Sequence, residues 1–262
     1  MDSGTEYPTS LGTSEADAIS LLGHDLAGEL MGKVSFGELA YWLMTQRRPS
    51  PGQSAIFDAV LVALADHGFT PTAIAARLTY LSAPDSVQGA LAAGLLGGGS
   101  RFLGVTEDTG QFLAAALADA GELPTDTAGW DELATRAVTA RRAAGQFVPG
   151  LGHPVHKAGD PRTPVLLALA HEHGMYGPYL ALFAAVGRVH PAILGKTLPL
   201  NGAGVCGAAL ADAGIEVAML RGVALLARCA GLLGHIAEEM RRPVGNSIYH
   251  TVDRNAVYVP PA

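Results

Sequence analysis

The segment MLRGVALLARCAGLLGHIAEEMRRP, from Met219 to Pro243, decides the fold class. Its apolar residues recur at helical spacing, so we predict one long helix over residues 217–240. Arg228 lies within the apolar stretch 225–230. An unpaired guanidinium is unfavourable in such a setting, so we expect a protein carboxylate or a carboxylate ligand beside it. The alternative is that Arg228 only extends its charge to solvent.

Helical spacing continues through most of the chain, and the β-branched alternation of strands is scarce. Ser50-Pro51 and Thr70-Pro71 each combine a hydroxyl N-cap with a proline in the first turn. We predict an all-α fold, with further helices over residues 36–46, 51–66, 71–80, 86–96, 109–120, 130–144, 164–173 and 179–189. Residues 1–14, rich in Ser, Thr and Gly, are expected to lack regular structure.

Composition narrows the function classes. The chain has 262 residues, 49% of them hydrophobic and 16% charged, with a net charge of −7 and no basic cluster, so nucleic acid is not an expected partner. Two cysteines, Cys206 and Cys229, form neither a disulfide framework nor a zinc motif, and no metal is expected. The polar, acidic beginning is unlike a signal peptide, and no apolar run reaches about 20 residues. We predict a cytoplasmic protein with no membrane partner.

The loop VPGLGHPVHKAGDPR, residues 148–162, contains the densest group of candidate catalytic and binding residues. His153 follows two glycines, and the cations Lys157 and Arg162 come after it. A histidine that titrates near neutrality, two cations and accessible backbone amides suit an anionic substrate with an exchangeable proton. The alternative is a surface loop with solvated charges.

This loop resembles that of citrate synthases, in which a glycine-flanked histidine is followed nine residues later by the arginine of an Asp-Pro-Arg turn. The resemblance implies that His153 binds the hydroxyl or carbonyl oxygen of citrate or oxaloacetate, and that Arg162 clamps a carboxylate. It also implies a coenzyme A site. There, Lys157 lies near the phosphates, and the wall is formed by Val148, Gly150, Leu151 and Gly152.

Two more segments resemble the same family. LVALADHGFTPTAIAARL, residues 61–78, is similar to its Asp-His segment, which implies that His67 is a second ligand of the hydroxy-tricarboxylate. Helix-terminal histidines are otherwise often structural. The 219–243 segment is similar to the family's C-terminal helix. This implies that Arg228 binds a substrate carboxylate and that Arg242 reaches the site of the other subunit in a homodimer. His235 we interpret as structural.

The three segments follow the family order from about residue 30 to 245. The resemblance implies a large helical domain from residues 1–104 and 204–262, a small domain from residues 105–203, and a cleft between them that holds coenzyme A and substrate. The shortness of the chain and the Gly-Ser-Arg-Phe at 99–102 resemble citryl-CoA lyases and the lyase module of ATP-citrate lyase.

Two positions depart from the citrate synthase pattern. Phe102 stands where citrate synthases have the histidine that binds the thioester oxygen. In TLPLNGAGVCG, residues 197–207, Asn201 and Gly202 fit the motif, but Ala203 stands where the catalytic aspartate is expected. A methyl group cannot exchange protons. The anion-binding half of the site therefore looks intact, and the enolate-forming half does not.

We predict a lyase that cleaves citryl-CoA, or a close 3-hydroxy-3-carboxyacyl-CoA, to acetyl-CoA and oxaloacetate by a retro-aldol or retro-Claisen step. In it, His67 and the arginines hold carboxylates, and His153 accepts or shares the hydroxyl proton. Backbone amides and Asn201 stabilise the enolate oxygen, and water or His156 protonates the enolate. The alternatives are a synthase that condenses an acyl-CoA with a 2-oxo acid, and a non-catalytic homologue that binds citrate and coenzyme A.

Overall fold

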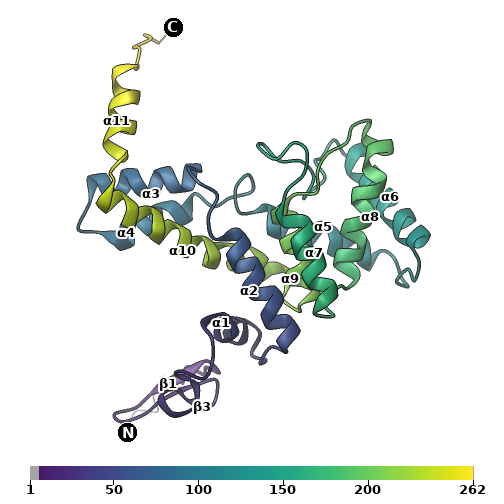
Figure 1. Cartoon of the computed structure of the whole chain (residues 1–262), viewed down its shortest axis with the longest axis horizontal. Helices are drawn as coiled ribbons and strands as arrows, with labels where there is room; N and C mark the ends of the chain where they lie inside the picture. Colours follow the sequence, from purple (N-terminus) through teal and green to yellow (C-terminus); the bar gives the residue numbers. More distant parts are fainter. Residues whose placement is uncertain (1–5, 262) are drawn as a thin grey trace.

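The chain folds almost entirely into helices, as Figure 1 shows for this computed structural model, which describes residues 6–261. The predicted all-α class is confirmed. In order, the elements are β1 (Gly12–Ser14), β2 (Ile19–Leu21), β3 (His24–Asp25), the π-helix η1 (Leu26–Leu30), α1 (Phe36–Thr45), α2 (Pro51–Ala65), α3 (Pro71–Ser82), α4 (Val87–Leu96), α5 (Val105–Ala118), α6 (Thr127–Ala143), α7 (Arg162–Glu172), α8 (Pro178–Leu194), α9 (Gly202–Asp212), the 3-10 helix η2 (Val217–Met219), α10 (Leu220–Arg241) and α11 (Gly245–Arg254).

The predicted helix starts at Pro51 and Pro71 are confirmed by their caps. Ser50 caps α2 in a capping box with Gln53, and the Thr70 hydroxyl accepts from the backbone N–H of Ala73 at the start of α3. Each cap satisfies backbone donors that have no partner inside the helix. The Thr70 cap fixes the end of the turn between these two helices, residues 66–70, and near its start the Asp66 carboxylate accepts from the backbone N–H of Gly68.

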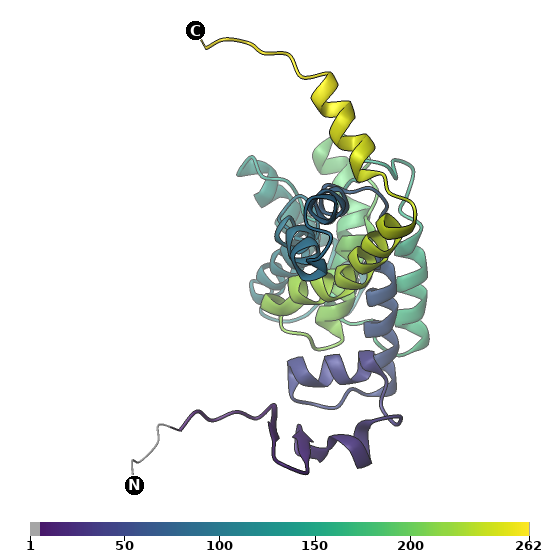
Figure 2. The same ribbon diagram turned by 90° about the vertical axis from the view of Figure 1, so that its left-hand side faces the viewer.

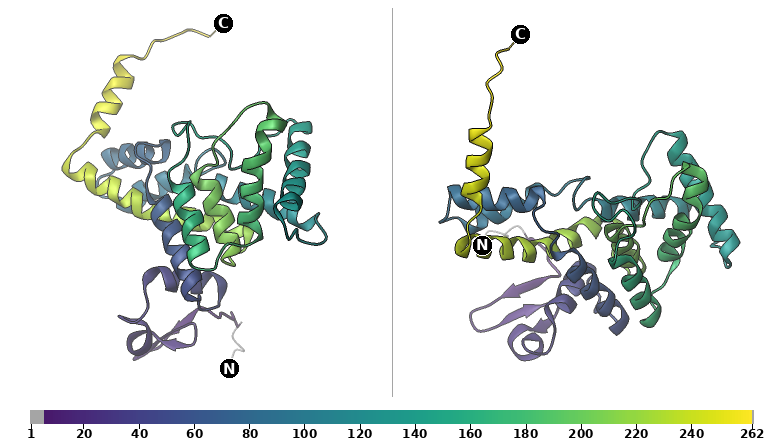
Figure 3. Two further views of the ribbon diagram at one scale, coloured as in Figure 1. Left: turned by 45° about the vertical axis from the view of Figure 1, so that its right-hand side comes forward. Right: turned by 45° about the horizontal axis from the view of Figure 1, so that its top comes forward.

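One large apolar core joins α1, α2 and α5 to α10. Its fully buried side chains include Phe57, Leu113, Phe183, Leu210 and Leu220. Residues from both predicted domains contribute to it, and the division at residues 104 and 203 stays a prediction. A smaller cluster lies between α3, α4 and the second half of α10, at the other end of the molecule from α6 and α8 (Figures 1 and 3).

Helix α9 is an addition to the predicted set, and it lies in the middle of the core with nearly every residue buried. Its glycines let neighbouring backbone approach. A Cβ at Gly204 would lie 2.6 Å from the Cα of Gly150, and one at Gly207 would lie 2.2 Å from the carbonyl oxygen of Thr106. Close backbone packing therefore explains a helix that contains three glycines.

Helix α10 runs from the middle of the molecule to the end formed by α3 and α4 (Figure 1). It crosses the end of α2 at Gly231, where a Cβ would lie 1.9 Å from the carbonyl oxygen of Ala65. By length and composition, Val217–Arg241 could cross a membrane. In the fold, however, it packs against α2, α3, α4 and α5, as the central helix of a helical protein does.

The N-terminal segment contains a small sheet that the sequence analysis did not predict. Strands β1, β2 and β3 pair antiparallel, with Thr13 opposite Ser20 and Leu21 opposite His24. The expectation of no regular structure is therefore wrong for Gly12–Ser14; residues 1–5 lie outside the described residues. Helix α11 and the chain after it project from the body (Figure 2).

Candidate active site

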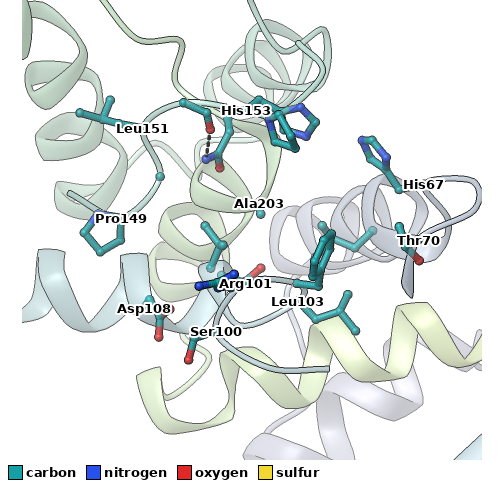
Figure 4. Close-up of a pocket in the computed structure, with 18 of the residues that line it drawn as sticks. His67, Thr70, Ser100, Arg101, Leu103, Asp108, Pro149, Leu151, His153 and Ala203 are labelled. Atoms are coloured by element: carbon teal, nitrogen blue, oxygen red, sulfur yellow. Dashed lines mark hydrogen bonds between the residues drawn. The ribbon is translucent and has the colours of Figure 1, made fainter. Parts of the chain in front are cut away.

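A cavity of about 1000 Å³ lies between the α2–α3 turn, residues 100–106, the loop 147–155, the start of α9 and the middle of α10 (Figure 4). The fold brings together most of the predicted site residues there. Those that line the cavity are His67, Val148, Gly150, Leu151, Gly152, His153, Arg162 and Arg228.

Lys157 and Arg242 do not line this cavity. Lys157 is exposed in the loop after His153, and Arg242 is exposed just beyond the end of α10. No contact within the described residues 6–261 gives either side chain a role in the cavity. Binding of coenzyme A phosphates by Lys157, and of substrate by Arg242 in a neighbouring subunit, stay predictions.

The wall predicted to bind coenzyme A is a tight glycine turn. Gly150 and Gly152 have φ of 82° and 81°, a conformation that favours glycine. The backbone N–H of Gly152 donates to the carbonyl of Pro199 at 2.7 Å, and that of Asn201 donates to the carbonyl of Gly150 at 2.9 Å. These bonds tie the wall to the start of α9, where Ala203 lies.

Arg228 is buried on the cavity wall without a carboxylate partner among residues 6–261. Its Nη1 donates to the hydroxyl of Thr70 at 3.4 Å, and its Nε has no partner within the same residues. Burial therefore lowers the pKa of Arg228 from its ordinary value. A buried guanidinium with unused donors that lines a cavity is a binding position for an anion.

Arg162 lines the same cavity in a different electrostatic state. Its Nε and Nη2 donate to the Asp160 carboxylate at 3.0 and 2.8 Å, and its Nη1 donates to the carbonyl of Ala63. Burial acts to lower the pKa of Arg162, but Asp160 raises it above its usual value. Most of its donors are thus already used inside the protein, so its predicted role as a clamp would depend on the remaining N–H groups.

We expect the environment of Asp160 to make the free energy of unfolding depend on pH. Burial alone would raise its pKa, but hydrogen bonds from Arg162 and from the backbone of Gly202 hold that pKa well below its usual range. The stabilisation is therefore complete above the unfolded-state pKa of about 3.9, and it is lost as the pH falls below that value. Asp160→Asn should lower the free energy of unfolding at pH 7 and flatten its decline between about pH 5 and 2, measured by urea unfolding. Equal declines in both proteins would contradict this.

Three histidines, His67, His153 and His156, lie close together, and the first two line the cavity. The ring centroid of His153 lies 5.2 Å from that of His67 and 4.4 Å from that of His156. Burial lowers the pKa of His153, and the two neighbouring histidines lower it further. The His153 ring is therefore held neutral near pH 7.

The backbone fixes the tautomer of His153. Its Nδ1 accepts hydrogen bonds from the backbone N–H groups of Val155 and His156, at 3.1 and 3.0 Å. The proton of the neutral ring must then be on Nε2. His153 can donate a hydrogen bond to a substrate oxygen, so this arrangement favours sharing the hydroxyl proton over accepting it.

The same tautomer bears on metal binding. Nitrogens of His67, His153 and His156 lie within 4.8 Å of one another, close enough to surround a metal ion. A metal-bound imidazole needs one unprotonated nitrogen free for the metal. His153 has its lone pair directed at backbone N–H groups and a proton on the other nitrogen, so the trio suits hydrogen bonding to a substrate better than metal ligation.

His235 is structural, and it supports the turn that carries His67. The fully buried Arg77 donates from Nε to His235 Nδ1 at 3.0 Å, and His235 Nε2 lies 2.9 Å from an oxygen of Asp66. Arg77 also donates to Glu239 at 2.8 Å. This chain of contacts connects α3 and α10 to the residue before His67.

The two departures from the citrate synthase pattern both lie at the cavity. Ala203 and Phe102 line it. Leu103, in the loop between α4 and α5, has a φ of 72°, which is strained for a residue other than glycine. The Asn201 side chain caps α9 and donates to the carbonyl of Gly152 at 2.8 Å. It holds the wall together, which leaves one amide N–H for the predicted oxyanion role.

The cavity also contains residues that the sequence analysis did not assign. Thr70 contacts Arg228, and Arg101 and Arg141 line the cavity. The lining thus contains four arginines and, among the described residues, a single carboxylate, Asp108. In a chain with a net charge of −7, this concentration of cations indicates an anionic ligand. Arg101 could have been assigned from the Gly-Ser-Arg-Phe segment.

Known proteins share this architecture. Residues 20–250 match the citrate synthase C-terminal domain family. Citryl-CoA lyase from Hydrogenobacter thermophilus superposes with a TM-score of 0.83 at 27% identity, over 98% of this chain and 96% of that one. ATP citrate lyase from Methanothrix soehngenii, solved with citrate and coenzyme A, gives a TM-score of 0.78 at 21% identity, over 100% of this chain and 43% of that one. A probable ATP-citrate synthase from Dictyostelium discoideum is 24% identical over 92% of this chain, which spans 39% of that relative's length.

The chain belongs to the citrate synthase family. Within this family, its likeness to the Hydrogenobacter thermophilus citryl-CoA lyase extends over nearly the whole of both chains. The predicted citrate synthase-like fold is confirmed.

Proposed function

We propose that the protein cleaves citryl-CoA, or a close 3-hydroxy-3-carboxyacyl-CoA, to acetyl-CoA and oxaloacetate. The observation that carries this proposal is the buried Arg228 guanidinium, which lines the cavity without a carboxylate partner among residues 6–261. A substrate carboxylate would supply the missing charge. The similarity to a citryl-CoA lyase over nearly its full length supports the same substrate.

The remaining groups suit a retro-aldol step. His67 lies in the α2–α3 turn near Thr70, which contacts Arg228, so the two residues can hold the carboxylate end of the substrate. His153 Nε2–H would donate to the 3-oxygen as it becomes a carbonyl. The glycine wall at 148–152 would receive the coenzyme A thioester, and its backbone amides would stabilise the enolate oxygen.

Two incubations test the proposal. Citryl-CoA should yield acetyl-CoA and oxaloacetate, followed by coupled reduction of oxaloacetate, whereas acetyl-CoA with oxaloacetate should release little thiol. Thiol release in the second mixture without cleavage in the first would favour the synthase. A thermal shift with citrate and no turnover of either mixture would favour a non-catalytic binder.

Ala203→Asp should create an enzyme that exchanges the methyl protons of acetyl-CoA with solvent. Ala203 lines the cavity in the first turn of α9, where a carboxylate is favoured by the helix dipole and could act as a base. Deuterium incorporation from D₂O, measured by mass spectrometry, should exceed that of the parent at least about tenfold. Ala203→Asn is the matched control, without a base. Equal incorporation in both variants would contradict the placement of Ala203.

We further propose a cytoplasmic homodimer in which Arg242 completes the neighbouring cavity. Arg242 is exposed next to the projecting α11, whose Tyr249 and Val252 are exposed as well, so this end of the chain is available to a second copy. Free cysteines, with burial raising the pKa of Cys206 to about 12, suit a reducing compartment. Light scattering of the wild type should give the mass of a dimer, and Arg242→Gln should lower the rate of citryl-CoA cleavage in the activity assay. A monomeric wild type would contradict the proposed assembly.

A further inference from the structure

Cleavage of a 3-hydroxyacyl-CoA needs a group that accepts the hydroxyl proton, and carboxylates do not supply one near His153. Asp108 is the single carboxylate among the described lining residues, and Figure 4 shows it away from His153, with Ala203 between them in that view. Asp160 is buried, and its oxygens already accept from Arg162 and Gly202. Among the side chains clustered around His153, the imidazoles remain as candidates for the acceptor.

Two of the three imidazoles have other tasks. His153 has its lone pair directed at two backbone N–H groups, so it can donate a proton but not accept one. His67 belongs to the turn that contacts Arg228, where the substrate carboxylate is expected. His156 is the third member of the cluster.

His156 lies close to both His153 and His67. Its ring centroid lies 4.4 Å from that of His153 and 5.6 Å from that of His67, and its ring makes no hydrogen bond within residues 6–261. The side chain is half-buried next to His153 and does not itself line the cavity. One bridging water, or a small inward movement of loop 153–159, would connect it to a substrate hydroxyl, and both are ordinary in catalysis.

We propose that His156 is the proton carrier of the reaction, in place of the aspartate that is absent at Ala203; this rests on the proposed function. Its free nitrogen takes the 3-hydroxyl proton, while the O–H electron pair forms the carbonyl of oxaloacetate. The carbon–carbon bond breaks, and its electrons form the thioester enolate. His156 then returns the proton to the enolate carbon, which gives acetyl-CoA. The proton count balances without any co-reactant.

His156→Gln removes the titratable group at similar size. Its kcat for citryl-CoA cleavage should fall about 100-fold or more, and its KM should change less than about threefold. His173→Gln is the matched control, because His173 is exposed at the end of α7, away from the cavity. His156→Gly should regain part of the lost rate when free imidazole is added, which a purely structural role would not allow.

The outcomes separate the two proposals. Wild-type cleavage with an unimpaired His156→Gln variant would overturn the role of His156 and leave the proposed function standing. If the wild type does not cleave citryl-CoA, the proposed function fails. The role of His156 is then tested by exchange of acetyl-CoA methyl protons in D₂O with oxaloacetate present. Exchange in the wild type but not in His156→Gln supports the role, and any other result overturns it.

Discussion

Arg228→Met should weaken citrate binding about 100-fold, yet leave the ligand-free protein at least as stable as the wild type. The two effects have one cause. Arg228 is buried and has no carboxylate partner among the described residues, so the empty protein gains little from its charge. A bound carboxylate supplies that partner. Replacing a buried charge by an apolar side chain of similar length then favours the empty protein and disfavours the complex.

Calorimetric titration with citrate and thermal unfolding without ligand measure both effects of Arg228→Met. Arg136→Met is a suitable control, because Arg136 pairs with Glu132 on the exposed face of α6 and should change neither quantity appreciably. Unchanged citrate affinity in Arg228→Met would contradict the anion site. A large loss of thermal stability would instead show that Arg228 is held by protein contacts.

Arg77→Met should lower the free energy of unfolding by about 3–5 kcal/mol, which corresponds to a fall of about 10 °C in the Tm. Arg77 is fully buried, as is nearly all of the Glu239 side chain. Burial would raise the pKa of Glu239, but bonds from Arg77 and from the backbone of Gly245 and Val244 lower it, so the carboxylate stays charged. Removing Arg77 leaves that charge without its partner, and His235 loses its donor.

The double variant Arg77→Met with Glu239→Met is the informative comparison. Removing both charges should restore much of the lost stability, since the unpaired charge rather than the missing contact causes most of the loss. Urea unfolding of the wild type, both single variants and the double variant gives the coupling energy. Additive losses would contradict an energetically coupled buried pair.

Local sequence chemistry predicted the helices well where they begin at a cap. Ser50-Pro51 and Thr70-Pro71 specify helix starts through hydrogen bonds within four residues, so no tertiary information is needed. The family resemblance also chose His67, His153, Arg162 and Arg228 correctly as neighbours of one cavity, although up to 161 positions separate them in the sequence. Their individual roles stay predictions.

Other features depend on contacts that a periodic pattern does not record. Helix α9 has no amphipathic stripe because most of its residues are buried, and its glycines read as turn residues when their neighbours are unknown. Strands β1 to β3 are mostly exposed, so they show no regular apolar alternation. The bond between Asp160 and Arg162, and the tautomer of His153, arise from hydrogen bonds that only the folded loop defines.

The contact at Gly231 has a consequence for substrate range. At Gly231, α10 touches the last turn of α2 with no room for even a methyl group. The backbone that carries Arg228 is therefore held at a fixed separation from the end of α2, just beyond which His67 lies. Moving the two helices apart to admit a bulkier acid would break this close packing. We therefore expect tolerance for altered substrates to lie on the acyl side, toward Phe102 and the glycine wall, and discrimination to lie on the acid side.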